Sequence, residues 1–89
     1  MTTRFAHIRY ENHNGDIIPR GGWTYAYKFL PDGKIAAARS QCSSLDNYCR
    51  RIGRDICQGR MMAGKYKVFE YDQSVDGPVV DFLLDAEWK

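Results

Sequence analysis

The stretch from Trp23 to Cys42 constrains the fold of this chain more than any other part of it. Its first half alternates large rings with smaller or polar residues, which is the period-2 pattern of a β-strand with one aromatic face. The rings are Trp23, Tyr25, Tyr27 and Phe29. Asp32-Gly33 then predicts a two-residue hairpin turn, because a type I′ turn needs positive φ at both central residues. The sequence therefore predicts two antiparallel strands joined by that turn.

A two-residue turn also fixes the pairing of these two strands. Each ring then lies beside a small side chain, in the pairs Phe29 with Ala36, Tyr27 with Ala38, Tyr25 with Ser40 and Trp23 with Cys42. Large beside small leaves a trough suited to a packing helix. We interpret the aromatic stripe as a core face, and the alternative is a row of rings that stacks on nucleic-acid bases. The opposite face, with Lys28 and Arg39, is expected to be solvated.

The N-terminal part of the chain predicts a strand over residues 3–10 and a loop over residues 11–22, rich in turn-forming Asn, Gly and Pro. Ile17 and Ile18 in that loop are apolar residues with no strand around them. They either close the edge of the core or contact a partner. The Arg20-Gly21-Gly22 sequence lacks the spacing and the lysine of a phosphate loop, which leaves a phosphate contact at Arg20 as an alternative.

One helix is predicted to begin at Ser43-Ser44, where either hydroxyl could accept a hydrogen bond from an N–H of the first turn. At 100° per residue, its apolar residues share one arc: Leu45, Tyr48, Cys49, Ile52 and Ile56. The opposite side carries three arginines, Arg50, Arg51 and Arg54. Gly53 weakens the middle of this helix, which indicates a close approach to another element. The helix ends at Gly59 or extends to Gly64.

Alternation predicts further strands over residues 65–71 and 79–88, with a turn over residues 73–78 between them. We assign residues 79–88 to a strand and not to a helix because their β-branched and aromatic content is high. The order is then strand, strand, strand, helix, strand, strand. We expect one α+β domain over residues 1–89, in which a mostly antiparallel sheet of about five strands carries one helix on one face, a two-layer arrangement. The other face is solvated, paired with a second copy or used for binding.

Charge is distributed unevenly along the chain, although the net charge is only +2. Residues 1–69 carry twelve bases and five acids, a net of +7, whereas residues 70–89 carry six acids and one base, a net of −5. A bipolar chain can steer a partner of either sign. The near-cancellation weakens the case for generic polyanion binding.

Neither a catalytic motif nor a metal or cofactor motif stands out in the sequence. Cys42, Cys49 and Cys57 lack the short paired spacing of a zinc knuckle, and they resemble small buried residues in a reducing compartment. His7 and His13 are distant from the cysteines in sequence, so no nucleophile with a nearby base is indicated. The sequence has no long apolar run and no signal-peptide pattern. We therefore expect a cytoplasmic, non-enzymatic protein that uses no metal or cofactor and binds no membrane.

The first functional hypothesis is an interaction module that docks onto a larger protein, as a monomer or weak homodimer. Small size, segregated charge and spare apolar residues favour it. Compact chains of this type resemble the small accessory proteins of bacteriophages and mobile elements, and this resemblance implies inhibition of a host enzyme or defence complex. The candidate contact residues are basic or apolar: Arg50, Arg51, Arg54, Lys28, Arg39, Ile17, Ile18 and Arg20.

The second hypothesis is a nucleic-acid-binding module. The order of three strands and a helix over residues 5–57 is similar to that of the arm-binding domains of tyrosine recombinases and of plant AP2-type DNA-binding domains. This resemblance implies contact with the major groove through the sheet. The alternative contact is the arginine side of the helix, and these two surfaces could not bind one flat ligand together.

Overall fold

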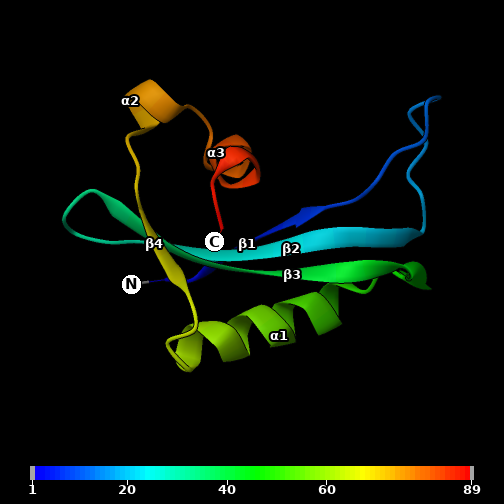
Figure 1. The fold of residues 1–89 in the computed structure, drawn as a ribbon, viewed down its shortest axis with the longest axis horizontal. Helices are drawn as coiled ribbons and strands as arrows, with labels where there is room; N and C mark the ends of the chain where they lie inside the picture. Colours follow the sequence, from blue (N-terminus) through cyan, green and yellow to red (C-terminus); the bar gives the residue numbers. More distant parts are fainter. Residues whose placement is uncertain (1, 89) are drawn as a thin grey trace.

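The structure, a computed structural model, describes residues 2–88, and for residues 44–46 it describes the backbone alone. The fold is α+β and contains one antiparallel sheet, which confirms the predicted class (Figure 1). Four strands follow one another across this sheet: β1 (Arg4–Ile8), β2 (Arg20–Phe29), β3 (Lys34–Asn47) and β4 (Lys67–Glu70). The helices are α1 (Arg50–Met62), α2 (Gln73–Asp76) and α3 (Val79–Asp85).

The turn between β2 and β3 is one residue longer than predicted. The Leu30 N–H donates to the Lys34 carbonyl at 2.8 Å, which leaves residues 31–33 as a three-residue loop. Gly33 ends that loop at a φ of 79°, in the left-handed region that three-residue hairpin loops place at this position. The Asp32-Gly33 signal therefore locates the hairpin correctly but gives the wrong loop length.

This one-residue difference changes the face on which each β3 residue lies, because successive strand residues point to opposite faces. Tyr25 pairs with Arg39 and not with Ser40. Arg39 consequently shares the aromatic face, whereas Lys28 lies on the other one. The expectation that Lys28 and Arg39 share a solvated face is wrong.

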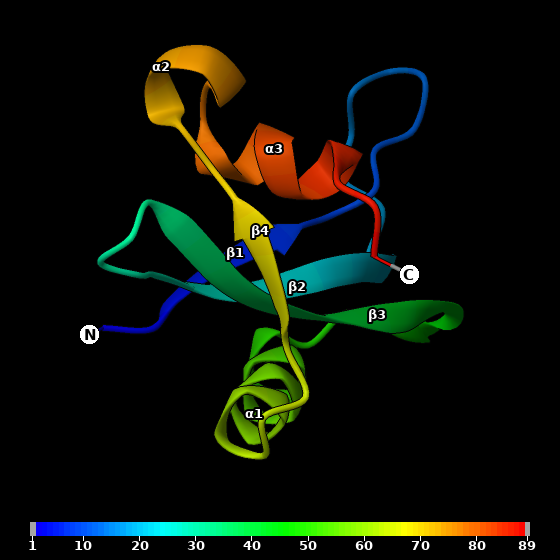
Figure 2. The same cartoon turned by 60° about the vertical axis from the view of Figure 1, so that its left-hand side comes forward.

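Helices cover both faces of the sheet, so the protein has three layers and not two (Figure 2). α1 packs on the face of small residues, where Cys57 and Met61 join Ala26, Ala36 and Ala38 in one buried cluster. α3 covers the aromatic face, where Leu83 is buried with Tyr25 and Tyr27. The aromatic stripe is thus core at Tyr25 and Tyr27, but the prediction that the long helix lies in its trough is wrong.

Residues 79–85 form helix α3 instead of the predicted fifth strand. Their aromatic and apolar residues pack onto the sheet: Leu83 is fully buried, and the Phe82 ring lies 5.0 Å from the Tyr71 ring and 5.9 Å from the Phe69 ring. This burial decides the conformation of the segment, since tertiary packing readily overrides β-propensity. The predicted turn at residues 73–78 contains the short helix α2.

α1 begins at Arg50, because the chain continues as β3 to Asn47, so the predicted start at Ser43-Ser44 is wrong. Tyr48 and Cys49 precede the helix, and the Leu45 side chain lies outside the described residues. The buried stripe of α1 consists of Gly53, Cys57 and Met61. Ile52 and Ile56 of the predicted apolar arc therefore lie outside the buried stripe.

Candidate interaction surface

α1 has two chemically different flanks beside its buried stripe. At 3.6 residues per turn, Arg50 and Arg54 fall on one side of the stripe, and Ile52, Ile56 and Arg60 fall on the other. The contacts agree with this placement: the Arg54 guanidinium lies 4.9 Å from the ring centroid of Phe5 on β1, whereas Arg60 donates to the main-chain carbonyl of Arg39 on β3. We name the first side the β1 flank and the second side the β3 flank.

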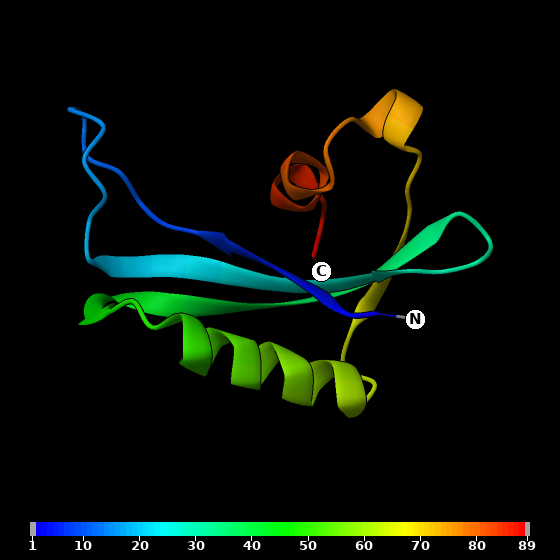
Figure 3. The ribbon, with the colours of Figure 1, turned by 180° about the vertical axis from the view of Figure 1, so that it is seen from behind.

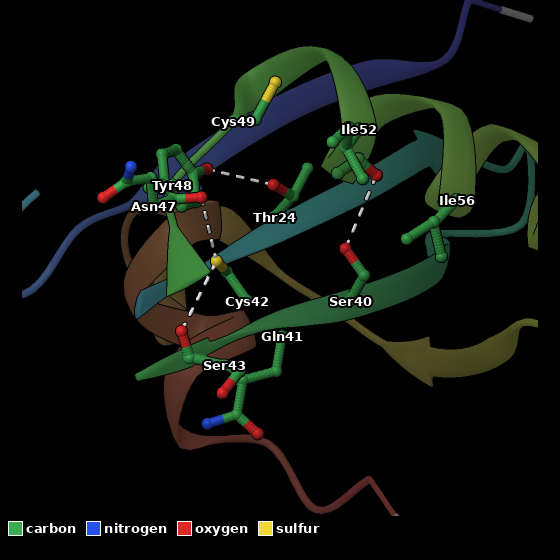
Figure 4. Close-up of a pocket in the computed structure, with 11 residues that line it drawn as sticks. Thr24, Ser40, Gln41, Cys42, Ser43, Asn47, Tyr48, Cys49, Ile52 and Ile56 are labelled. Carbon is green, nitrogen blue, oxygen red and sulfur yellow. Dashed lines mark hydrogen bonds between the residues drawn. The ribbon is translucent and has the colours of Figure 1, made fainter. Parts of the chain in front are cut away.

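The β3 flank exposes apolar surface. Ile52 is 60% exposed and Ile56 is 43% exposed. Both side chains lie between α1 and β3, where they border a hollow of about 480 Å³ (Figure 4). Polar groups of β2 and β3 complete the lining, among them the hydroxyls of Thr24 and Ser40. This hollow is open to a ligand with both apolar and hydrogen-bonding groups.

The outer side of β3 is only partly covered by β4. β4 begins opposite Ala37 and pairs with residues 34–37 alone, which are the first part of β3 (Figure 3). In the described part of the chain, no strand pairs with the outer side of residues 38–41. We name these residues the open edge of β3.

The ladder determines which backbone groups face outward at the open edge, because alternate residues of an antiparallel strand direct them to opposite sides. The Lys34 carbonyl accepts a hydrogen bond from the Leu30 N–H on the β2 side. The Gly33 carbonyl, in contrast, accepts from the Tyr71 N–H on the β4 side, at 3.3 Å. The backbone N–H and C=O groups of the odd-numbered β3 residues therefore face away from β2. At the open edge these are Arg39 and Gln41, and Arg60 donates to the carbonyl of Arg39.

A second hollow, of about 300 Å³, lies farther along the same edge, where β4 begins beside Ala37. Its lining includes four cationic side chains together with Tyr66 and Trp88; the cations are Arg39, Arg60, Lys65 and Lys67. No acid occurs among the described residues that line it. The open edge thus has an apolar and polar hollow at one end and a basic hollow at the other.

A polar network fixes the segment that leads into α1. The Tyr48 hydroxyl lies 2.8 Å from His7 Nδ1 and 3.0 Å from Thr24 Oγ1, and it donates to the Trp23 carbonyl at 3.2 Å. Partial burial lowers the pKa of His7 below its ordinary value of 6.5, and the positive charges of Arg50 and Arg54 lower it further. His7 is therefore mainly neutral at pH 7, and this network holds Tyr48 in place beside the first hollow.

The three cysteines differ in their surroundings. Cys57 is buried under α1, where its thiol donates to the Thr24 carbonyl at 3.2 Å, and burial raises its pKa. A thiol held neutral in this way contributes packing and not reactivity. Cys42 is half-buried and Cys49 is exposed, and both line the first hollow.

The described residues present neither a metal-binding cluster nor a membrane-spanning helix. No group of three His, Cys, Asp or Glu side chains among them is arranged to hold a metal ion. None of the helices in this part of the chain combines the length and the apolar character needed to cross a bilayer.

The structure brings some of the predicted basic residues together and separates others. Arg50, Arg51 and Arg54 are exposed on α1, as predicted. Lys28 lies on the α1 side of the sheet, with its ammonium 5.6 Å from the Tyr66 ring centroid. Arg39 lies on the other side, where its guanidinium is 4.8 Å from the ring centroids of both Trp23 and Trp88.

The remaining predicted contacts lie in or beside the loop between β1 and β2. This loop rises on the α3 side of the sheet (Figure 1). Ile17 is 58% exposed, Ile18 is half-buried, and the exposed Arg20 begins β2. Neither isoleucine lines either of the two hollows beside the open edge.

Sequence reasoning missed the β3 flank and the open edge. Helical periodicity counted from Ser43 placed Ile52 and Ile56 in a buried arc. A signal that could have corrected this is the small-residue spacing of Gly53 and Cys57, four residues apart, since a close helix–sheet approach needs small side chains at the contact.

The uneven charge along the sequence becomes a separation in space. α1 carries four arginines and one acid, whereas six acids lie between residues 70 and 87, in and around α2 and α3 on the other side of the sheet (Figure 2). Among the described residues, none of the four α1 arginines forms an ion pair. Helix α1 on one side of the sheet is therefore basic, and the segment with α2 and α3 on the other side is acidic.

Comparison of the chain with protein-family models, with curated proteins and with solved structures finds no match. Its function is therefore inferred from its own geometry and charge.

Proposed function

We propose that this protein is a non-enzymatic interaction module that docks onto a larger, acidic protein through α1 and thereby blocks or tethers it. The observation that carries the proposal is the exposure of Ile52 and Ile56 beside a hollow of about 480 Å³. Exposed apolar residues on an arginine-rich helix are characteristic of protein interfaces, in which Arg is enriched and the centre is apolar. Two neighbouring isoleucines on an exposed helix flank do not promote solubility, and exposed apolar surface of this kind marks an interaction site.

Charge supports an acidic partner. The four arginines of α1 are exposed and form no ion pair in the described part of the structure, and the acids of α2 and α3 are on the opposite side of the sheet. Such a charge distribution would orient the protein during encounter, with α1 toward a negative surface.

Nucleic acid is the competing ligand. Helices cover both faces of the sheet, so the sheet contact implied by the order of three strands and a helix lacks an open face. The α1 arginines remain able to contact phosphates. The β3 flank, however, presents isoleucines where a surface that follows a phosphate backbone would need cations.

The test compares capture of proteins from a cell lysate by the immobilised wild-type chain and by an Ile52→Ser/Ile56→Ser variant, with quantification by mass spectrometry. The matched control is Met62→Ser, since Met62 is 79% exposed on α1 but lines neither hollow. We expect acidic proteins to be retained by the wild type and the control and lost with the isoleucine variant.

Anisotropy of labelled single- and double-stranded DNA and RNA over a salt series accompanies the capture. We expect no binding at physiological salt. Tight, steeply salt-dependent binding that the isoleucine variant retains would establish the nucleic-acid reading and refute the proposed function.

A further inference from the structure

We infer that the open edge of β3 accepts an extended, acidic segment of the partner as an additional strand. This inference rests on the proposed protein partner and specifies how that partner is recognised. Strand addition to an exposed sheet edge obtains its affinity from main-chain hydrogen bonds and its specificity from pockets for alternate side chains. The open edge offers outward backbone groups at Arg39 and Gln41, and a hollow lies at each end.

The two hollows predict which side chains the added strand carries. Ser40 faces α1, since its hydroxyl donates to the Gly53 carbonyl at 3.5 Å. A partner residue paired with Ser40 would also face α1 and would contact Ile52 and Ile56. The partner residue two positions away, beside Ala38, would face the same way and would reach Arg60 and Lys65.

The recognised pattern is therefore an apolar residue and an acidic residue separated by one position. The apolar residue comes first if the added strand runs antiparallel to β3, and the acidic residue comes first if it runs parallel. β4 already occupies the edge beside Ala37, so the added strand cannot extend past the basic hollow, whichever direction it runs.

Arg60 gives this site an exchange mechanism. In the unbound protein it donates to the outward carbonyl of Arg39, a type of contact that protects an edge from indiscriminate pairing. An N–H of the added strand would replace it at that carbonyl. The released guanidinium could then form a bidentate pair with the partner's carboxylate, so recognition of the main chain and of the acid would be coupled.

Charge favours an acidic partner over a second copy of this chain at the edge. The second hollow contains four cationic side chains and no acid among its described residues. A second copy that paired through the same edge would bring another basic hollow in place of a carboxylate. A second copy is therefore expected to bind the open edge more weakly than an acidic segment does. The experiment below can reveal such self-pairing.

The experiment begins with selection of phage-displayed random eight-residue peptides on the full-length protein. We expect enrichment of an acidic residue two positions from an apolar one. The best synthetic peptide is then compared with two derivatives, one with the acid changed to lysine and one N-methylated at alternate residues on the bonding edge. We expect each derivative to bind at least about tenfold more weakly.

Protein variants test the same contacts from the other side. Arg60→Glu should reverse the preference and bind the lysine peptide better than the acidic one. Gln41→Pro removes an outward N–H and should weaken binding about tenfold or more, since proline is tolerated on strand edges. If Gln41→Pro fails to fold, the N-methylated peptide with wild-type protein still tests the main-chain bonds.

The outcomes separate the inference from the proposed function. Full binding of the N-methylated peptide, or enrichment of helical amphipathic peptides, would overturn strand addition, while isoleucine-dependent capture of acidic proteins would still stand. A dimer in light scattering that Gln41→Pro abolishes would assign the edge to a second copy and overturn the acidic segment. Loss of every isoleucine-dependent interaction would remove both proposals.

Discussion

Gly53 of α1 lies so close to Thr24 of β2 that a Cβ atom at Gly53 would be only 2.2 Å from Thr24 Oγ1. No side chain larger than hydrogen fits at this contact. The glycine therefore sets the distance between α1 and the sheet, and the alanines around it make the same close approach possible. This approach also places Ile52 and Ile56 at the β3 flank beside the open edge.

Replacement of Gly53 by alanine should destabilise the protein by about 1–3 kcal/mol, because the added methyl group overpacks against Thr24. Urea denaturation measures the change. The control is Gly59→Ala in the same helix, where nothing lies within 4 Å of the new Cβ. There, better helix propensity should raise stability by up to about 1 kcal/mol. Equal effects of the two substitutions would contradict the close contact.

Leu83 should be essential for the packing of α3 on the aromatic face of the sheet. It is fully buried, so Leu83→Ala should cost about 2–5 kcal/mol of unfolding free energy. Its neighbour Leu84 is 45% exposed, and Leu84→Ala should change stability by less than about 1 kcal/mol. If the two variants unfold at the same urea concentration, α3 does not pack on the sheet as described.

Stability should fall as the solution is acidified, partly because of His7. Its pKa is lowered below 6.5 in the folded protein, so the unfolded chain binds the proton more tightly and stability is lost as pH falls through 6.5. His7→Gln, which keeps a hydrogen-bonding group, should flatten the stability profile between about pH 7 and pH 5. An unchanged slope in His7→Gln would exclude this origin of the pH dependence.

Removal of the predicted arginine cluster should leave the fold intact. Arg50, Arg51 and Arg54 are exposed, and replacement of all three by glutamine should change the unfolding free energy by about 1 kcal/mol or less. The same variant should raise the pKa of His7 relative to the wild type, since two of the removed charges lower it. NMR titration of the His7 ring measures this. Unfolding of the variant would show that α1 depends on these side chains.

The local sequence pattern predicted those parts of the fold in which the residue type by itself determines the backbone conformation. Alternation located the β2–β3 hairpin, and Gly53 correctly indicated a close contact. The loop length could not be read from Asp32-Gly33, because these residues suit both a two-residue turn and the end of a three-residue loop. That one-residue ambiguity moved Arg39 to the wrong face.

The remaining differences are tertiary in origin. Residues 79–85 are helical because Leu83 and Phe82 fill the aromatic face, which no local propensity encodes. The candidate surface depends on where β3 ends and β4 begins, and element boundaries are set by pairing with distant residues. The arginines of α1 were predictable as exposed, whereas the exposure of Ile52 and Ile56 was not.

Residue-resolved amide hydrogen exchange, recorded with and without the selected acidic peptide, tests the binding surface most directly. In the unbound protein, the outward amides of Arg39 and Gln41 should exchange faster than those of Ala38 and Ser40, which face β2. With the peptide bound, both should slow by at least about tenfold. Unchanged exchange at Arg39 and Gln41, with protection confined to the β1 flank, would show that the partner binds elsewhere.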